Sequence, residues 1–286
     1  MHAGNCTRDA DPREGMVYDR TMKELYDILV VDDEQVVIDA AKKILLSEGY
    51  LVDTVPDAES AIQRLHGRAY KMIITDLMLP RMSGLEFIGI VKKMYSQIVL
   101  VMITGYGTLE NAVASFTQGV FDYIPKPFSL DELLGVVSRA VKYSEMATVE
   151  EKNNFIGIPD AFGRISGYYF MGKHSWARKE RDESYSIGPG MAFSRVIKDV
   201  TEITLPSFND EIIQGRPCGH LISGDRLIHT VWSPLSGKVI GRNGDLEKDP
   251  ALIVSDPFEA GWLARIIPSN TEMELKNLFS LDSRRD

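Results

Sequence analysis

Between residues 26 and 143, short apolar runs alternate with longer stretches in which apolar residues recur every three or four positions. The short runs predict strands at 28–31, 51–55, 71–75, 98–103 and 121–124. The longer stretches predict helices at 36–48, 57–66, 84–95, 109–118 and 130–143. Alternating strands and helices indicate an α/β fold with a doubly wound, five-stranded parallel sheet. Because the first, third and fourth runs are almost continuously apolar, we expect them to be the central strands.

The pattern changes after residue 141, where a polar stretch that ends in Gly and Pro is typical of a connection. From residue 164 onward, Gly and Pro are more frequent, and short alternating segments predict a compact β-rich domain with one helix at 191–198. We therefore predict an N-terminal tail (1–25), a first domain (26–145), a linker (146–163) and a second domain (164–286).

Composition narrows the class of protein. The content of 44% hydrophobic and 26% charged residues is that of a soluble globular protein, and the net charge of −9 argues against a general nucleic-acid binder. Cys6 and Cys218 are too few for a disulfide framework, which favours a reducing cytoplasm. No uncharged run has the length of a membrane span, and the polar N-terminus has no signal-peptide core. We expect a protein that is neither exported nor embedded in a membrane.

Polar residues close four of the predicted strands. They are Asp32 and Asp33 after the first strand, Asp76 after the third, Thr104 after the fourth and Lys126 after the fifth. Taken singly, such residues often cap helices or face solvent. In a parallel sheet, however, the carboxyl ends of the strands share one crevice, so we expect these side chains to meet there. The Lys126-Pro127 bond is predicted to be restrained, with a cis peptide as one of its two forms.

The aspartates predict a metal site with a nucleophile in it. Mg²⁺ prefers carboxylate oxygens, so Asp33 and Asp76 are expected to bind it directly and Asp32 through a water. The backbone carbonyl of Met78 is well placed to contribute. Because a carboxylate beside a metal ion can attack phosphorus, Asp76 is the candidate nucleophile.

The segments VVDDE, ITDLMLPRMSGLEF, MITGYGTLENAV and FDYIPKPFSLDEL resemble the receiver domain of two-component response regulators, which is flavodoxin-like, over residues 25–145. The resemblance implies that Asp76 accepts a phosphoryl group from the histidine of a sensor kinase and that Lys126 pairs with it. It also implies that Thr104 holds a phosphate oxygen and that Tyr123 moves inward. Receivers can dimerise through the face formed here by 109–118, 121–124 and 130–143, and the sequence leaves open whether this chain does.

The segments WSPLSGKVIGRN and DPFEAGWL resemble the H protein of the glycine cleavage system, a lipoyl carrier, over about residues 164–280. The resemblance implies a barrel-sandwich hybrid of two small sheets, with a lipoylated lysine on a hairpin turn. Aligning the SPLSG segment places that lysine at Arg226, and Ser223 replaces the glutamate three residues before it. A guanidinium stays protonated and cannot be acylated in this way, so no lipoate is expected. Lys238 follows the SPLSG turn and is disfavoured as a shifted attachment point.

The leading hypothesis is a cytoplasmic phosphorylation switch rather than an enzyme, although the receiver can catalyse its own phosphotransfer and dephosphorylation. Its partners would be a sensor histidine kinase and an unidentified protein that binds the second domain. One alternative is transcriptional control. Residues 145–286 hold 17 Lys and Arg against 21 Asp and Glu and show no DNA-reading helix pattern, so a partner protein would have to bind the DNA. The other is a carrier of glycine cleavage or 2-oxoacid metabolism, which Arg226 opposes.

The histidines at 174, 220 and 229 lack metal-ligand spacing, so we expect them at the surface or hydrogen-bonded.

Overall fold

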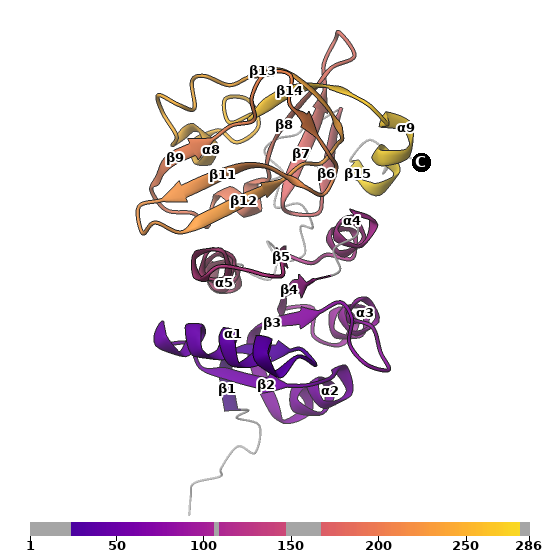
Figure 1. Ribbon diagram of the computed structural model, residues 1–286, viewed down its shortest axis with the longest axis vertical. Coiled ribbons are helices and arrows are strands. Elements are labelled where there is room, and N and C mark those ends of the chain that lie inside the picture. Colours follow the sequence, from indigo (N-terminus) through magenta and orange to yellow (C-terminus); the bar gives the residue numbers. More distant parts are fainter. Residues whose placement is uncertain (1–23, 106–108, 147–166, 281–286) are drawn as a thin grey trace, which may run out of the picture.

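The computed structural model describes residues 24–105, 109–146 and 167–280. Figure 1 shows an α/β domain, coloured indigo to magenta, below a β-rich domain, coloured salmon to yellow, with α4, β5 and α5 on the side where the two meet. The boundaries of the predicted linker stay a prediction, because only Met146 of it is among the described residues.

The α/β domain has five parallel strands, as predicted, and their order is β2-β1-β3-β4-β5. The strands are β1 (Glu24–Val31), β2 (Val52–Val55), β3 (Arg68–Asp76), β4 (Val99–Thr104) and β5 (Asp122–Pro125). The helices are α1 (Gln35–Ser47), α2 (Ala58–Gly67), α3 (Gly84–Met94), α4 (Leu109–Thr117) and α5 (Leu130–Met146). Strands β1, β3 and β4 are central in this order, as predicted, and they are the most apolar because helices cover both of their faces.

The two faces of this sheet build two apolar clusters. On β1, for example, Val30 faces the cluster that includes α1 and α5, whereas Leu29 faces the cluster of α2, α3 and α4. The start of α3 is fixed by a reciprocal cap, in which the Ser83 hydroxyl accepts from the Glu86 N–H and the Glu86 carboxylate accepts from the Ser83 N–H. Gly84 follows, and a Cβ there would lie 2.0 Å from the carbonyl oxygen of Asp76. The turn into α3 therefore packs directly against the end of β3.

One feature of the α/β domain differs from the sequence prediction. Strands β1 and β3 begin several residues early because they pair with each other from Glu24 and Arg68 onward. Gly49 and Gly119 follow helices with positive φ, as is typical of glycine caps, whereas Gly67 is the last residue of α2 and has no positive φ.

The β-rich domain contains two antiparallel sheets. The larger has the order β10-β13-β14-β8-β7-β6-β15 and the smaller the order β12-β11-β9. The strands are β6 (Tyr168–Met171), β7 (Ser175–Lys179), β8 (Tyr185–Pro189), β9 (Val200–Thr204), β10 (Glu211–Ile212), β11 (Pro217–Ser223), β12 (Ile228–Trp232), β13 (Gly237–Arg242), β14 (Ala264–Pro268) and β15 (Phe279–Ser280). The short helices are α7 (Met191–Ser194), α8 (Leu252–Ser255), α9 (Thr271–Glu274) and the 3₁₀ turn η2 (Leu275–Asn277).

The helix predicted at 191–198 is therefore too long. Helix α7 ends at Ser194, and the chain then turns at Asp199, which has a φ of 50°, before it enters β9. The two small sheets agree with the predicted barrel-sandwich arrangement.

The apolar core continues from one domain into the other. Phe116 and Tyr123 from the α/β domain belong to the same cluster of buried residues as Met171 and Trp232 from the β-rich domain. On the other side of β5, Val196 joins the cluster that contains the buried face of α5. None of the helices in the described part of the chain is long and apolar enough to cross a bilayer.

Candidate functional site

Three aspartates meet at the carboxyl end of the parallel sheet, as the sequence predicts. Asp32 and Asp33 directly follow β1, and Asp76 is the last residue of β3. Each offers an oxygen atom, and these atoms lie within 4.8 Å of one another. Asp32 and Asp76 are buried, whereas Asp33 is exposed. The cluster is therefore closed on the protein side and accessible from the side of Asp33.

Lys126 reaches into this cluster from the loop after β5. Its Nζ lies 2.7 Å from Asp32 Oδ2, 2.9 Å from Asp76 Oδ2 and 2.8 Å from Glu34 Oε1. Burial alone would lower the pKa of Lys126, but its close contacts with the carboxylates of Asp32, Glu34 and Asp76 outweigh this effect and raise the pKa above its usual range. The lysine therefore stays charged. The Lys126-Pro127 peptide is cis, one of the two forms allowed by the sequence.

Glu34 is part of this site and was missed by the sequence analysis. It directly follows the acidic pair in the segment VVDDE, so the available signal was a third consecutive carboxylate. Its N–H donates to Asp32 Oδ1 at 2.9 Å, so it orients Asp32 as well as contacting Lys126.

The donor set fits a hard divalent cation. Burial raises the pKa of Asp32, against the opposing effect of Lys126 and of the Glu34 N–H. Asp32 Oδ2 touches Lys126 but makes no well-aligned hydrogen bond, so this buried oxygen still has free acceptor capacity. A Mg²⁺ ion would satisfy it. The Met78 N–H lies 3.3 Å from Asp76 Oδ1, which puts the Met78 backbone beside the candidate nucleophile.

Thr104 and Tyr123 lie on the two strands next to the cluster. Thr104 is the buried last residue of β4, and its carbonyl accepts a hydrogen bond from the Lys126 N–H at 2.9 Å. Tyr123 is a buried residue of β5, and burial raises the pKa of its phenol. Its ring meets the ring of Trp232 edge-on, with the centroids 5.4 Å apart. Tyr123 therefore touches the β-rich domain directly.

Arg226 lies on an exposed hairpin turn, where the alignment places the carrier lysine. The turn joins β11 to β12, and Arg226 has a φ of 64° while its N–H donates to the Ser223 carbonyl. Lys238 lies within β13, paired with Glu211 and Ile267, as predicted for a strand residue.

A buried ion pair at the boundary between the domains was not anticipated from the sequence. Asp122 on β5 and Arg139 on α5 are each 1% exposed, and the Arg139 guanidinium donates to the Asp122 carboxylate. The indole N–H of Trp232 donates to Asp122 Oδ1 at 3.0 Å, and the imidazole of His174 lies 3.5 Å from the same oxygen. The available signal was weak, because Asp122 interrupts the predicted fifth strand but Arg139 lies outside the apolar positions of the predicted helix.

The protonation of His229 follows from its two neighbours. Arg139 is only a donor and points at Nδ1, so Nδ1 must be the acceptor and the proton must be on Nε2. Nε2 then donates to the Ser223 hydroxyl at 2.9 Å, and that hydroxyl donates to Asp225. His229 is thus hydrogen-bonded, which is one of the two predicted states, and it is neutral. For His174 the prediction is wrong, because this side chain is buried and neither of its ring nitrogens makes a hydrogen bond within the described residues.

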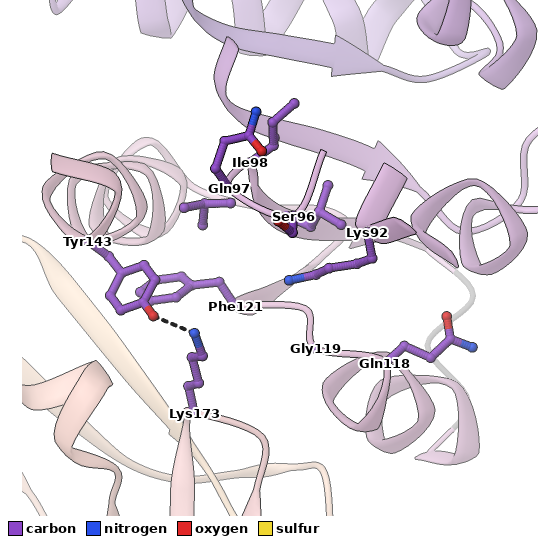
Figure 2. A pocket seen from close by; sticks show the side chains of 11 residues that line it. Lys92, Ser96, Gln97, Ile98, Gln118, Gly119, Phe121, Tyr143 and Lys173 are labelled. Atoms are coloured by element: carbon purple, nitrogen blue, oxygen red, sulfur yellow. Dashed lines mark hydrogen bonds between the residues drawn. The ribbon is translucent and has the colours of Figure 1, made fainter. Parts of the chain in front are cut away.

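A cavity of about 260 Å³ lies at the other end of β4 and β5, away from the aspartates. Figure 2 shows Lys92 and Lys173 pointing toward Phe121, which lines it together with Tyr143. Lys173, in the turn between β6 and β7, donates to the Tyr143 hydroxyl of α5. This contact is a second polar link between the domains.

The fold should lose stability in mild acid because of the two buried histidines. Burial and the charge of Arg139 lower the pKa of His229 to about 3. Burial lowers the pKa of His174 to about 4, although nearby Asp122 opposes the shift. Their neutral forms stabilise the fold fully above the unfolded pKa of about 6.5, and this contribution is lost as pH falls toward 4.

We expect thermal melts in steps from pH 7.5 to 4.5 to show the midpoint falling below pH 6.5. His229→Gln should flatten the fall, because it removes one of the two titrating groups. A midpoint that stays constant over this range would contradict the neutral state of both histidines.

Comparison with known proteins agrees with this two-part arrangement. Residues 28–138 match the family described as response regulator receiver domain, and residues 168–285 match the family described as glycine cleavage H-protein. The nitrogen assimilation regulatory protein NtrX of Azorhizobium caulinodans is 38% identical over 119 residues, which are 41% of this chain and 26% of that protein. The chain spans about a quarter of the length of such regulators.

The similarities to the second half cover nearly a whole protein. The glycine cleavage system H protein of Shewanella halifaxensis is 33% identical over 113 residues, 41% of this chain and 86% of that protein.

Among solved structures, a match to the first half is the receiver domain of NtrX from Brucella abortus. It is 38% identical and covers 42% of this chain and all of that one, with a TM-score of 0.40.

Over its α/β half, the chain is therefore similar to the receiver domain of response regulators. Over its β-rich half, the chain belongs to the glycine cleavage H-protein family.

Proposed function

We propose that this protein is a response regulator that accepts a phosphoryl group on Asp76 from a phosphohistidine of a sensor kinase. The observation that carries the proposal is the cluster of three aspartates in contact with Lys126. In the transfer, an oxygen of Asp76 forms a bond to phosphorus as the phosphorus–nitrogen bond breaks, and the imidazole of the kinase leaves. Hydrolysis of the acyl phosphate by water then resets the switch.

The neighbouring groups have distinct roles in this proposal. Asp32, Asp33 and Asp76 would hold Mg²⁺, which supplies positive charge against the phosphoryl oxygens, and the Met78 carbonyl would complete the set. Lys126 already contacts Asp76 and would pair with the phosphoryl group. Thr104 would hold a phosphoryl oxygen.

The output in this proposal is a change in protein contacts made by the H-protein-like domain. Arg226 at the exposed turn cannot be acylated as a lysine is, so this domain would act without lipoate. We place the activity in the cytoplasm, with a sensor kinase and an unidentified protein as partners and without direct contact with nucleic acid or membrane. Homodimerisation through α4, β5 and α5 stays a prediction, and it would require that face to be uncovered.

The test is phosphorylation of the purified full chain by Mg²⁺ and a small acyl-phosphate donor. We expect the intact mass to rise by one phosphoryl group and the tryptophan emission to change, because Trp232 contacts Tyr123. The mass of protein made in a lipoylation-competent host should show no lipoyl group.

Two outcomes would contradict the proposal. A chain that gains no base-labile phosphoryl group when Mg²⁺ and donor are present is not a phosphoacceptor. A lipoyl adduct would show that the second domain is a carrier. Omitting Mg²⁺ serves as the matched control and should prevent the uptake.

A further inference from the structure

The hairpin β11–β12, which contains Arg226 in its turn, is also the part of the H-protein-like domain that lies against α5. Backbone atoms approach closely in this contact: a Cβ at Gly135 in the middle of α5 would lie 2.1 Å from the carbonyl oxygen of Ile228. No side chain fits in that space without moving the hairpin. Helix and hairpin therefore meet in a close contact that depends on glycine.

A chain of hydrogen bonds continues from the turn into the receiver domain. It runs from Asp225 through Ser223 and His229 on the hairpin to Arg139 on α5, and from there to Asp122 on β5. Although both members of the ion pair belong to the receiver, the groups that cover it come from the other domain. These are His174, His229, Trp232 and the ring of Phe193, whose centroid lies 4.5 Å from the Arg139 guanidinium carbon.

The same contact surface connects to the proposed phosphorylation site through β5. Asp122 Oδ1 accepts from the Tyr123 N–H at 2.7 Å, and the Tyr123 ring packs on Trp232. Three residues further along the chain, Lys126 contacts Asp76. A shift of this short strand would therefore change the contacts of Lys126 with the aspartates and the contacts of Asp122 and Tyr123 with the hairpin.

We propose that the β11–β12 hairpin is the docking element that holds the H-protein-like domain on β5 and α5 of the unphosphorylated receiver, and that phosphorylation of Asp76 releases it. The second half of this statement rests on the proposed function. The occupant of the receiver face is a named segment of this same chain, so the face becomes available to other proteins only after release.

The composition of the contact is suited to docking that can be reversed. A buried ion pair contributes little net stability because desolvation offsets the attraction, yet it becomes costly when its partners are rearranged. The shared apolar cluster around Phe116, Tyr123 and Trp232 favours the docked state in the resting chain. A phosphoryl group that draws Lys126 toward itself would bias β5 toward a second position, and only such a differential interaction can shift the equilibrium.

The test compares Gly135→Ala with Gly89→Ala in the full, unphosphorylated chain. Both glycines lie inside helices, but a Cβ at Gly89 meets nothing within 4 Å, so this variant is the matched control. Alanine increases helix propensity at both positions, so loss of the receiver fold is not the expected effect. For Gly135→Ala we expect a larger radius of gyration in small-angle scattering and amide exchange in residues 228–232 that is about tenfold faster. Gly89→Ala should match the wild type.

A second comparison uses wild type before and after treatment with Mg²⁺ and an acyl-phosphate donor, with uptake confirmed by mass. Phosphorylated protein should move toward the Gly135→Ala values in both measurements. His229→Ala, which removes the acceptor of an Arg139 hydrogen bond, should move in the same direction without phosphorylation.

Each part can fail separately. If Gly135→Ala and His229→Ala keep the scattering and exchange of the wild type, the hairpin is not the docking element. If Gly135→Ala opens but confirmed phosphorylation changes neither measurement, docking is not controlled by Asp76. If no phosphoryl group is taken up, the proposed function fails, whereas the docking result from the unphosphorylated variants still stands.

Discussion

Asp76→Asn should abolish phosphoryl uptake completely while leaving the fold intact. The amide has nearly the shape of the carboxylate and can still accept from the Met78 N–H, but it is not a nucleophile toward phosphorus. Lys126 keeps its contacts with Asp32 and Glu34, so the site should not collapse. The measurement is intact mass after incubation with Mg²⁺ and an acyl-phosphate donor, with circular dichroism as the check on folding.

The matched control is Asp39→Asn, the same chemical change at an exposed position on α1 whose side chain accepts from Gln35. It should be phosphorylated like the wild type. Uptake by Asp76→Asn at the wild-type level would move the nucleophile to another residue and remove the basis of the proposed mechanism.

Asp122→Ala should cost about 3–5 kcal/mol of unfolding free energy, a typical loss when one partner of a buried pair is removed. Arg139 would remain buried with its charge uncompensated, and the Trp232 N–H would lose its acceptor. Burial already lowers the pKa of Arg139, and Asp122 opposes that effect, so the guanidinium depends on this carboxylate. Denaturant titration followed by tryptophan emission measures the loss.

The double variant Asp122→Ala with Arg139→Met tests the cause. It removes both charges and keeps an apolar side chain on α5, so it should recover much of the stability lost in Asp122→Ala. If the double variant is as unstable as the single one, the loss comes from packing rather than from an uncompensated charge.

Much of the receiver fold could be predicted because its hydrophobic pattern is regular. The meeting of Asp32, Asp76 and Lys126 follows from one rule, that parallel strands end at the same edge of a sheet. The central position of β1, β3 and β4 follows from their almost continuously apolar sequences. The errors of the sequence prediction lie at the ends of helices and strands. Helix α7, for example, stops at Ser194 because tertiary contacts in a β-rich domain override the local apolar spacing.

The domain contact could not be predicted in this way. Asp122 and Arg139 lie only 17 positions apart, but the groups that cover them, such as His229, are 90 positions from Arg139. No periodicity links residues at that separation. Gly135 likewise reads as an ordinary glycine in a helix, and only the position of the Ile228 carbonyl explains it.

The pairing of β6 with β15 has a consequence for biosynthesis. Strand β6, near the start of the H-protein-like domain, pairs with β15 at residues 279 and 280, so the larger sheet cannot be completed until the ribosome has made these residues. The receiver is translated first, so until then its Arg139–Asp122 pair and the apolar residues of α5 that the second domain covers would be exposed to water. We therefore expect nascent chains stalled before residue 279 to expose this surface and to bind chaperones.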